Sequence, residues 1–267
     1  MRRLRLTIEF DGTEFSGWQR QAAGERTVQA VLEKAFDQLP GKRSSISGAG
    51  RTDAGVHALG MVGHIDVQST IPDKKLSQAL NAYLPNDVVV LKVETVDDQF
   101  EAQFGCKYRR YLYRFWVCRE ERFGLALNRA RVFPVFSQLD QGAMSRAAKV
   151  FEGSRDFSAL ATQETRSRIR TVHMCTLERS HAEYRLHIAG DGFLRNMVRA
   201  IVGTLILVGS GKISVEQVDN ILESKDRSQA GKNVSPRGLY FVEAGYTTWG
   251  QSISDLLAFE RIANVLG

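Results

Sequence analysis

Hydrophobic and polar residues alternate at the start of the chain, which predicts a strand with one buried face. Apolar side chains occupy every second position of residues 4–10, and Asp11-Gly12 ends the segment. Apolar residues then recur at helical spacing from Val28 to Leu39, after Thr27 as a helix cap and before Pro40-Gly41. Further strands are expected near residues 61–67 and 88–96, and a second helix at residues 73–83. The first part of the chain therefore mixes strands with helices.

The second part of the chain shows a similar mixture. Residues 107–117 predict a long strand, and five of its side chains share one face: Lys107, Arg109, Tyr111, Tyr113 and Phe115. Helices are expected at residues 139–151 and 215–223, a hairpin at 171–179 and 182–189, and a last strand at 239–246. The most regular helical stripe covers residues 194–206 and stops at Gly209-Ser210-Gly211. We expect an α+β fold with two domains, residues 1–103 and 104–267, whose largely antiparallel sheets are flanked by helices and meet at a basic central cleft.

Length and composition favour a soluble protein with two cores. The chain has 267 residues, of which 43% are hydrophobic. Its longest apolar run, residues 201–208, is too short to cross a bilayer, and its first residues do not resemble a signal peptide. The three cysteines, Cys106, Cys118 and Cys175, form no metal-binding pair, and an odd number argues against a disulfide framework. We therefore expect a cytoplasmic protein without a membrane partner.

Positive charge is concentrated in the second part of the chain. The formal net charge of +6 divides into −2 for residues 1–103 and +8 for residues 104–267. Between residues 107 and 131, eight basic side chains face only Glu120 and Glu121 and alternate with aromatic ones; the basic residues are Lys107, Arg109, Arg110, Arg114, Arg119, Arg122, Arg129 and Arg131. Basic residues interleaved with aromatic ones are typical of RNA-binding surfaces, and a solvated basic face is the simpler alternative. Arg110 and Arg114 are the candidate contacts to an RNA backbone.

A glycine-rich segment from Gly48 to His57 holds a single carboxylate, that of Asp53. Small residues at positions 48, 49, 50 and 55 allow the backbone to turn sharply and a bulky ligand to come close. Arg51 lies two residues before the acid, where it could bind a phosphate or a base. Aspartate and glycine also dominate ordinary surface turns, so a solvated turn is the alternative interpretation.

The segment Gly50-Arg51-Thr52-Asp53-Ala54-Gly55-Val56-His57 closely resembles the catalytic motif of the TruA family of tRNA pseudouridine synthases. Other segments resemble the same family and together span nearly the whole chain. They are Phe10-Asp11-Gly12 with Gly17-Trp18-Gln19-Arg20, Val28-Gln29, Asn81 with Leu84-Pro85, Arg109-Arg110-Tyr111-Leu112-Tyr113, and Phe193 with Met197-Val198-Arg199 and Ile201-Val202-Gly203.

The resemblance implies isomerisation of uridine to pseudouridine in the anticodon stem-loop of tRNA, at positions 38 to 40. It further implies a homodimer and a reaction that uses no cofactor and no metal. Asp53 would be the essential carboxylate, either as nucleophile or as base, and Arg199 would balance its charge. Tyr111 would stack on the target base, and Arg51 would help to hold that nucleotide out of its helix.

One segment departs from the family pattern. In Phe100-Glu101-Ala102-Gln103-Phe104, family members usually carry His and Arg in place of Glu101 and Gln103. Fewer positive groups there put the family's usual RNA contacts of that segment in doubt.

Other functions have less support in the sequence. A synthase acting on another RNA remains an alternative, as does an RNA-binding module without catalysis. A nuclease would need a carboxylate cluster for metal or a catalytic histidine pair, and the five histidines show no such spacing. The chain also has no nucleotide-binding glycine loop with its lysine.

Overall fold

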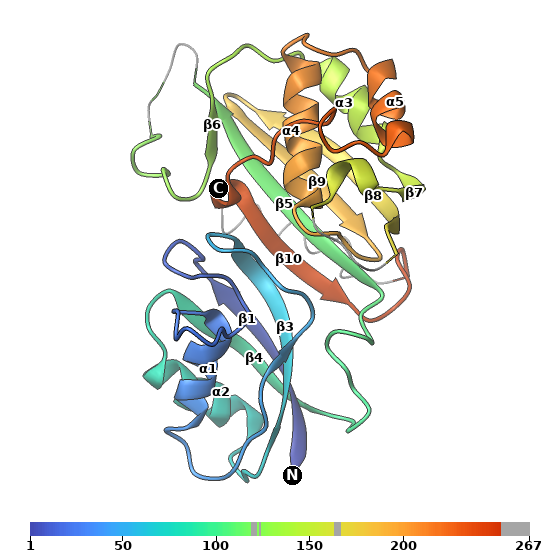
Figure 1. Cartoon of the computed structure of the whole chain (residues 1–267). Coiled ribbons are helices and arrows are strands. Elements are labelled where there is room, and N and C mark those ends of the chain that lie inside the picture. Colours follow the sequence, from blue (N-terminus) through green and yellow to red (C-terminus); the bar gives the residue numbers. More distant parts are fainter. Residues whose placement is uncertain (119–121, 123, 163–166, 252–267) are drawn as a thin grey trace. The chain divides into compact units, whose positions relative to one another are not determined.

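The computed structural model describes residues 1–118, 122, 124–162 and 167–251. These residues form two compact units, one made of residues 1–107 and 240–251, the other of the described residues of Tyr108–Leu239. Each unit combines a mostly antiparallel sheet with helices, which confirms the α+β class (Figure 1). The central cleft stays a prediction.

The sheet of the first unit is built on the alternating strand at the start of the chain. It has the order β4 (Val88–Val96), β1 (Arg2–Phe10), β3 (His57–Val67) and β10 (Leu239–Gly245). Strand β1 runs antiparallel to both of its neighbours, and its leucines and isoleucine are fully buried. Strand β10 is expected from sequence to belong with the second half, but it pairs in parallel with β3. A sequence pattern identifies a strand but not its partner, so this assignment needed the structure.

Two helices pack against each other and cover this sheet (Figure 1). Helix α1 (Val28–Phe36) begins at Thr27, whose side chain accepts a hydrogen bond from the Ala30 backbone N–H, as its sequence predicts. Helix α2 (Asp73–Tyr83) buries Leu76 and Leu80 and lies along β4. Helix α1 ends three residues earlier than its apolar spacing suggests.

The sheet of the second unit has the order β5 (Tyr108–Val117), β9 (Glu183–Gly190), β8 (Ile169–Ser180) and β7 (Gly153–Asp156), all antiparallel. The short strand β6 (Phe133–Val135) pairs in parallel with β5. Strands β6 and β7 are too short to be recognised from their sequence pattern.

Helices α3 (Gln141–Val150), α4 (Met197–Gly209) and α5 (Glu216–Ser224) lie on one side of this sheet (Figure 1). They pack on the face that carries Tyr113, Phe115 and Tyr184, all buried. Single 3₁₀ turns occur at Ser158–Leu160 and Pro236–Gly238. Within the described residues, no helix combines the length and the apolar character needed to span a membrane. The three cysteines are buried free thiols.

Candidate active site

The Asp53 turn connects the short strand β2 (Ser47–Gly48) to β3. β2 pairs with β3, and the Ala49 N–H donates to the Val62 carbonyl at 2.7 Å. The turn closes where the Val56 N–H donates to the Asp53 carbonyl at 3.2 Å. Asp53 is half-buried and Arg51 is exposed. The carboxylate therefore sits on backbone that is fixed from both sides.

The glycine-tryptophan pair Gly17-Trp18 packs directly against this turn. The Trp18 N–H donates to the Thr52 carbonyl at 3.1 Å. Gly17 has a φ of +93°, and a Cβ there would lie 2.4 Å from the same carbonyl oxygen. A Cβ at Gly48 would lie 2.5 Å from the indole of Trp18. Two segments about 35 residues apart in sequence are thus packed so closely that neither leaves room for a side chain at Gly17 or Gly48.

Helix α1 holds both the segment before β2 and the segment around Arg20 through a buried carboxylate, that of Glu33. Its Oε1 accepts hydrogen bonds from the Ser45 hydroxyl at 2.7 Å and the Ile46 N–H at 3.0 Å, just before β2. Its Oε2 accepts one from the Arg20 guanidinium at 2.7 Å. Gln29, one helical turn earlier, donates to Glu33 at 2.9 Å and accepts from the Arg20 N–H at 2.9 Å. The sequence gives no signal that singles out Glu33.

Replacing Glu33 with glutamine is expected to destabilise the protein by about 1 to 3 kcal/mol near pH 7, because charge-assisted hydrogen bonds are removed from a buried place. Burial raises the pKa of this carboxyl, but the bonds from Ser45, Gln29 and Ile46 and the charge of Arg20 outweigh it and hold the pKa below its ordinary value. A lowered folded pKa means that the stabilisation is present above the unfolded pKa and is lost as pH falls through the folded pKa. The difference between wild type and Glu33→Gln should therefore narrow in acid.

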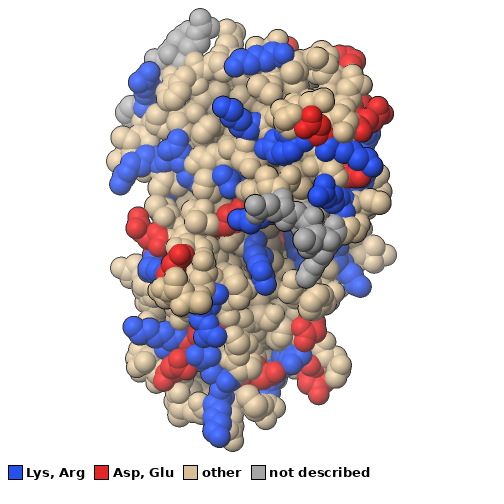
Figure 2. Space-filling model, in the orientation of Figure 1, with Lys and Arg blue, Asp and Glu red and all other residues tan. Residues whose placement is uncertain are grey.

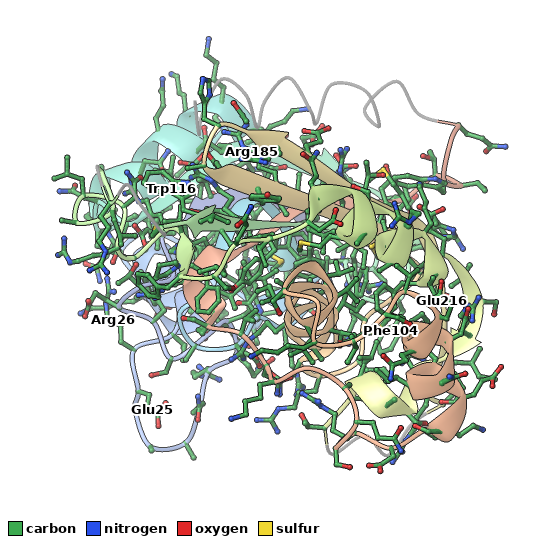
Figure 3. All side chains as sticks on the ribbon, turned by 90° about the horizontal axis from the view of Figure 1, so that it is seen from above. Glu25, Arg26, Phe104, Trp116, Arg185 and Glu216 are labelled. Carbon is green, nitrogen blue, oxygen red and sulfur yellow. The ribbon has the colours of Figure 1, made fainter. Side chains whose placement is uncertain are left out.

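Urea unfolding at neutral and stepwise lower pH measures this difference. Glu25→Gln is the matched control, since Glu25 is an exposed glutamate on the loop before α1 (Figure 3) and should change stability by less than about 0.5 kcal/mol. Equal stability of wild type and Glu33→Gln near pH 7 would contradict the anchoring role.

In the second unit, the structure brings Tyr111 against the segment that precedes α4. Tyr111 is only 8% exposed, and its ring meets that of Phe193 edge to face with centroids 5.2 Å apart. Tyr113, two positions further along β5, is fully buried and donates its hydroxyl to the Ser235 carbonyl at 2.7 Å. Burial raises the pKa of the Tyr113 hydroxyl.

Arg199 projects from the first turn of α4, with its guanidinium held by the protein. Its Nε donates to the Val234 carbonyl at 2.7 Å, and one terminal nitrogen donates to the Asn196 side-chain oxygen at 2.8 Å. The side chain is half-buried. Sequence analysis singles out Arg199 but not Asn196, whose role depends on the conformation of the chain before the helix.

Arg110 and Arg114, expected from sequence to bind the RNA backbone, are buried at 0% and 4% exposure. Arg114 donates to Glu183 on the neighbouring strand at 2.6 Å, and Glu183 also binds Arg185. In Figure 3, Arg185 lies on the side of the sheet away from α4. Arg114 is thus both buried and paired with a carboxylate, while Arg110 is buried; their role as contacts to an RNA backbone stays a prediction. Strand parity shows which residues share a face but not what covers that face.

Exposed positive charge in this region lies between β5 and β6 instead. Arg122, Arg129 and Arg131 are exposed, and Arg122 lies 5.2 Å from the ring of Phe136, itself 57% exposed. Figure 2 shows Lys and Arg side chains spread over the face of the second unit turned to the viewer. Arg119, Glu120 and Glu121 lie outside the described residues.

The segment that departs from the family pattern is held inside the first unit. Glu101 pairs with Arg3 at 3.2 Å, and Phe100 packs on Tyr246 with ring centroids 4.8 Å apart. Glu101 thus forms an ion pair with Arg3 near the start of β1, and a histidine at position 101 would offer no negative charge.

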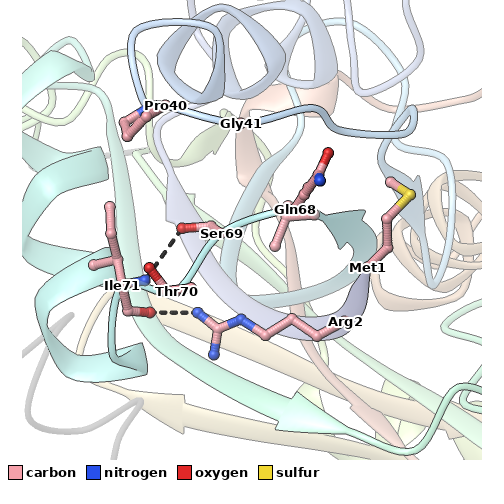
Figure 4. Close-up of a pocket in the computed structure, with 9 residues that line it drawn as sticks. Met1, Arg2, Pro40, Gly41, Gln68, Ser69, Thr70 and Ile71 are labelled. Carbon is pink, nitrogen blue, oxygen red and sulfur yellow. Dashed lines mark hydrogen bonds between the residues drawn. The ribbon is translucent and has the colours of Figure 1, made fainter.

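A pocket of about 380 Å³ lies elsewhere in the first unit, around the first residues of the chain and residues 67–71 (Figure 4). Its one guanidinium, that of Arg2, is bound by the Ile71 carbonyl and by Asp73 at 2.7 Å. The pocket contains none of the predicted site residues. Among the residues that the structure describes, no group of three His, Cys, Asp or Glu side chains is arranged to hold a metal ion.

Comparison with known proteins matches this chain to one family. A family model described as tRNA pseudouridine synthase matches residues 6–108 and 147–247. The tRNA pseudouridine synthase A of Acetivibrio thermocellus is 43% identical over 92% of this chain and 100% of its own length. Those of Clostridium botulinum (strain Eklund 17B) and Methylocella silvestris are each 41% identical over 92% of this chain, covering 100% and 99% of their own lengths.

The chain belongs to the TruA family of tRNA pseudouridine synthases. Asp53 and Arg199 lie within the ranges that the family model matches, and Tyr111 lies in the stretch between them. A solved structure, "Crystal Structure of a Cbf5-Nop10-Gar1 Complex", aligns with 98% of this chain and 56% of that chain at 12% identity and a TM-score of 0.38, a likeness too low to add to the family assignment.

Proposed function

We propose that this tRNA pseudouridine synthase acts on the anticodon stem-loop, at positions 38 to 40, with Asp53 as its essential carboxylate. Conversion of uridine to pseudouridine in tRNA follows from membership of the family. The target positions and the roles of individual residues are what the proposal adds. The observation that carries it is the Asp53 turn, a carboxylate on backbone fixed by Trp18, by β3 and, through Ser45 and Ile46, by Glu33.

The reaction exchanges one bond between uracil and ribose for another. The N1–C1′ bond breaks and a C5–C1′ bond forms, while C5 loses a proton and N1 gains one, so no atoms are added or removed. Asp53 serves as nucleophile or as base in this sequence. Arg199 balances the charge of the carboxylate, and Tyr111 stacks on the uracil while it changes its point of attachment.

The target nucleotide must also leave its stack, which costs a few kcal/mol and requires compensating contacts. Arg51 is the proposed contact, because it is exposed and lies two residues before Asp53. Family resemblance further predicts a homodimer, and composition predicts a cytoplasmic location; both stay predictions.

Incubation of the protein with unmodified tRNA transcripts, followed by chemical mapping of pseudouridine, tests the proposal. We expect product at positions 38 to 40 and none in transcripts whose uridines there are replaced by cytidine. Product at other positions only would assign the enzyme to a different tRNA site. Binding of tRNA without any product would contradict the catalytic assignment.

Affinity for tRNA is expected to fall steeply with salt, and the Arg129→Ala/Arg131→Ala double variant should show a shallower dependence. Removing one bond to a phosphate lowers the slope of log K against log salt by up to about 0.9. Both arginines are exposed beside β6, which suits contacts to a polyanion. Filter binding across a salt series measures the slopes.

The matched control is the Lys74→Ala/Lys75→Ala variant, which removes the same charge from the exposed side of α2. Its slope should equal that of the wild type. Parallel lines for wild type and the arginine variant would exclude those two side chains as backbone contacts.

A further inference from the structure

The start of helix α4 departs from the usual chemistry of a helix cap. Asn196 occupies the cap position, where asparagine normally accepts a hydrogen bond from a backbone N–H of the first turn. Thr27 and Asp140 do so at the starts of α1 and α3. Asn196 makes no such bond, and its φ is +64°, in the left-handed region, instead of extended. Its side chain is therefore used for something other than the helix.

The Asn196 amide bridges two groups on opposite sides. Its oxygen accepts from the Arg199 guanidinium at 2.8 Å, and its nitrogen donates to the Thr162 hydroxyl at 2.8 Å. Asn196 lies three residues before Arg199, and with the left-handed backbone at Asn196 its side-chain oxygen reaches the guanidinium. The Thr162 N–H also donates to the Arg195 carbonyl at 3.3 Å, which ties this stretch of chain to the start of α4.

The protein holds the guanidinium of Arg199 through at least two of its nitrogens. Asn196 holds a terminal nitrogen, and the Val234 carbonyl holds Nε at 2.7 Å. An arginine side chain has many rotamers, and a catalytic charge is most effective when it is held in place before the substrate arrives. Local departures from standard backbone geometry gather at such sites because the surrounding structure supports them for function.

We infer that Asn196 is a positioning residue for the isomerisation, which fixes the guanidinium of Arg199 for its role in catalysis. The inference rests on the proposed function, in which Arg199 balances the charge of Asp53. It assigns to Asn196 an effect on kcat and not on the affinity for tRNA, because the amide acts through Arg199 and its own side chain is already bonded within the protein.

Asn196→Gly is the decisive variant, since glycine adopts a φ of +64° without strain while the side chain that carries the amide is removed. We expect kcat to fall at least about 10-fold. Affinity for unmodified tRNA, measured in the Asp53→Asn background to prevent turnover, should stay within about 3-fold of the Asp53→Asn parent. Arg199→Lys should lower kcat by itself, and adding Asn196→Gly to it should cause little further loss, because the lysine has no guanidinium left to position.

His181→Gly is the matched control, as His181 has a φ of +54° in the exposed turn between β8 and β9. It should retain wild-type kcat. The inference is overturned, and the role of Arg199 stands, if Asn196→Gly keeps wild-type kcat while Arg199→Lys loses activity. The same conclusion follows if the fold-loss in kcat of the double variant equals the product of the two single losses. If Arg199→Lys keeps wild-type kcat, the role proposed for Arg199 is overturned, and the inference with it. A lower melting temperature for Asn196→Gly with unchanged kcat would mark the amide as structural only.

Discussion

Asp53→Asn is expected to remove more than about 99% of the turnover and to leave tRNA affinity within a few fold of wild type. Asparagine keeps the size of the side chain but cannot act as nucleophile or accept a proton, and a general base alone contributes about 10²- to 10⁴-fold. The backbone bonds that fix the turn involve Ala49, Thr52 and the Asp53 carbonyl, none of which the substitution changes. Single-turnover assays on a tRNA transcript measure the rate.

Two control measurements accompany Asp53→Asn. Filter binding reports its affinity for tRNA, and thermal unfolding reports its stability. Both should resemble the wild type, since the side chain is half-buried and its neighbours are small. If the variant retains more than about a tenth of the wild-type turnover, Asp53 is not the essential carboxylate. A variant that no longer folds would mean that the carboxylate holds the turn together, and Asp53→Glu would then be the test of position.

Arg199→Met is expected to reduce turnover by roughly 100-fold or more while the second unit stays folded. In the proposed function Arg199 balances the charge of Asp53, so its removal leaves that carboxylate uncompensated, which is costly away from water. Methionine is flexible and apolar, and α4 is among the most buried helices of the unit, so it can accommodate the change. Single-turnover rates of pseudouridine formation on a tRNA transcript near neutral pH measure the effect.

The control for Arg199→Met is Arg195→Met, an exposed arginine one turn before it. That variant should affect turnover far less. Unchanged turnover in Arg199→Met would remove Arg199 from the site. Loss of the melting transition would instead assign the guanidinium a structural role, through its bonds to Val234 and Asn196.

Local patterns were sufficient for most of the elements. The alternation of residues 4–10 predicted β1, and the regular stripe of residues 194–206 predicted α4, because burial of one face imposes a period of 2 on strands and 3.6 on helices. Motif resemblance also identified the family that the comparisons confirm. The short strands β6 and β7 were not predicted, because three or four residues are too few to show a period of 2.

The tertiary structure decided which strands pair with each other and which side chains are buried. Sequence could not show that β10 joins β3, that a buried Glu33 anchors the Asp53 turn, or that Arg110 and Arg114 lie inside. Each depends on residues far apart in the chain meeting at one place, and periodicity contains no information about the partner.

By itself, the sequence of this protein determined most of its elements, its family and the residue types of its candidate site. The tertiary structure alone decided which of those residues are accessible and which are held. The physical reason is that an arginine on a strand or an asparagine before a helix has the same local propensity wherever it lies. Burial by other segments, the ion pair with Glu183 and the left-handed turn at Asn196 determine what each side chain can do.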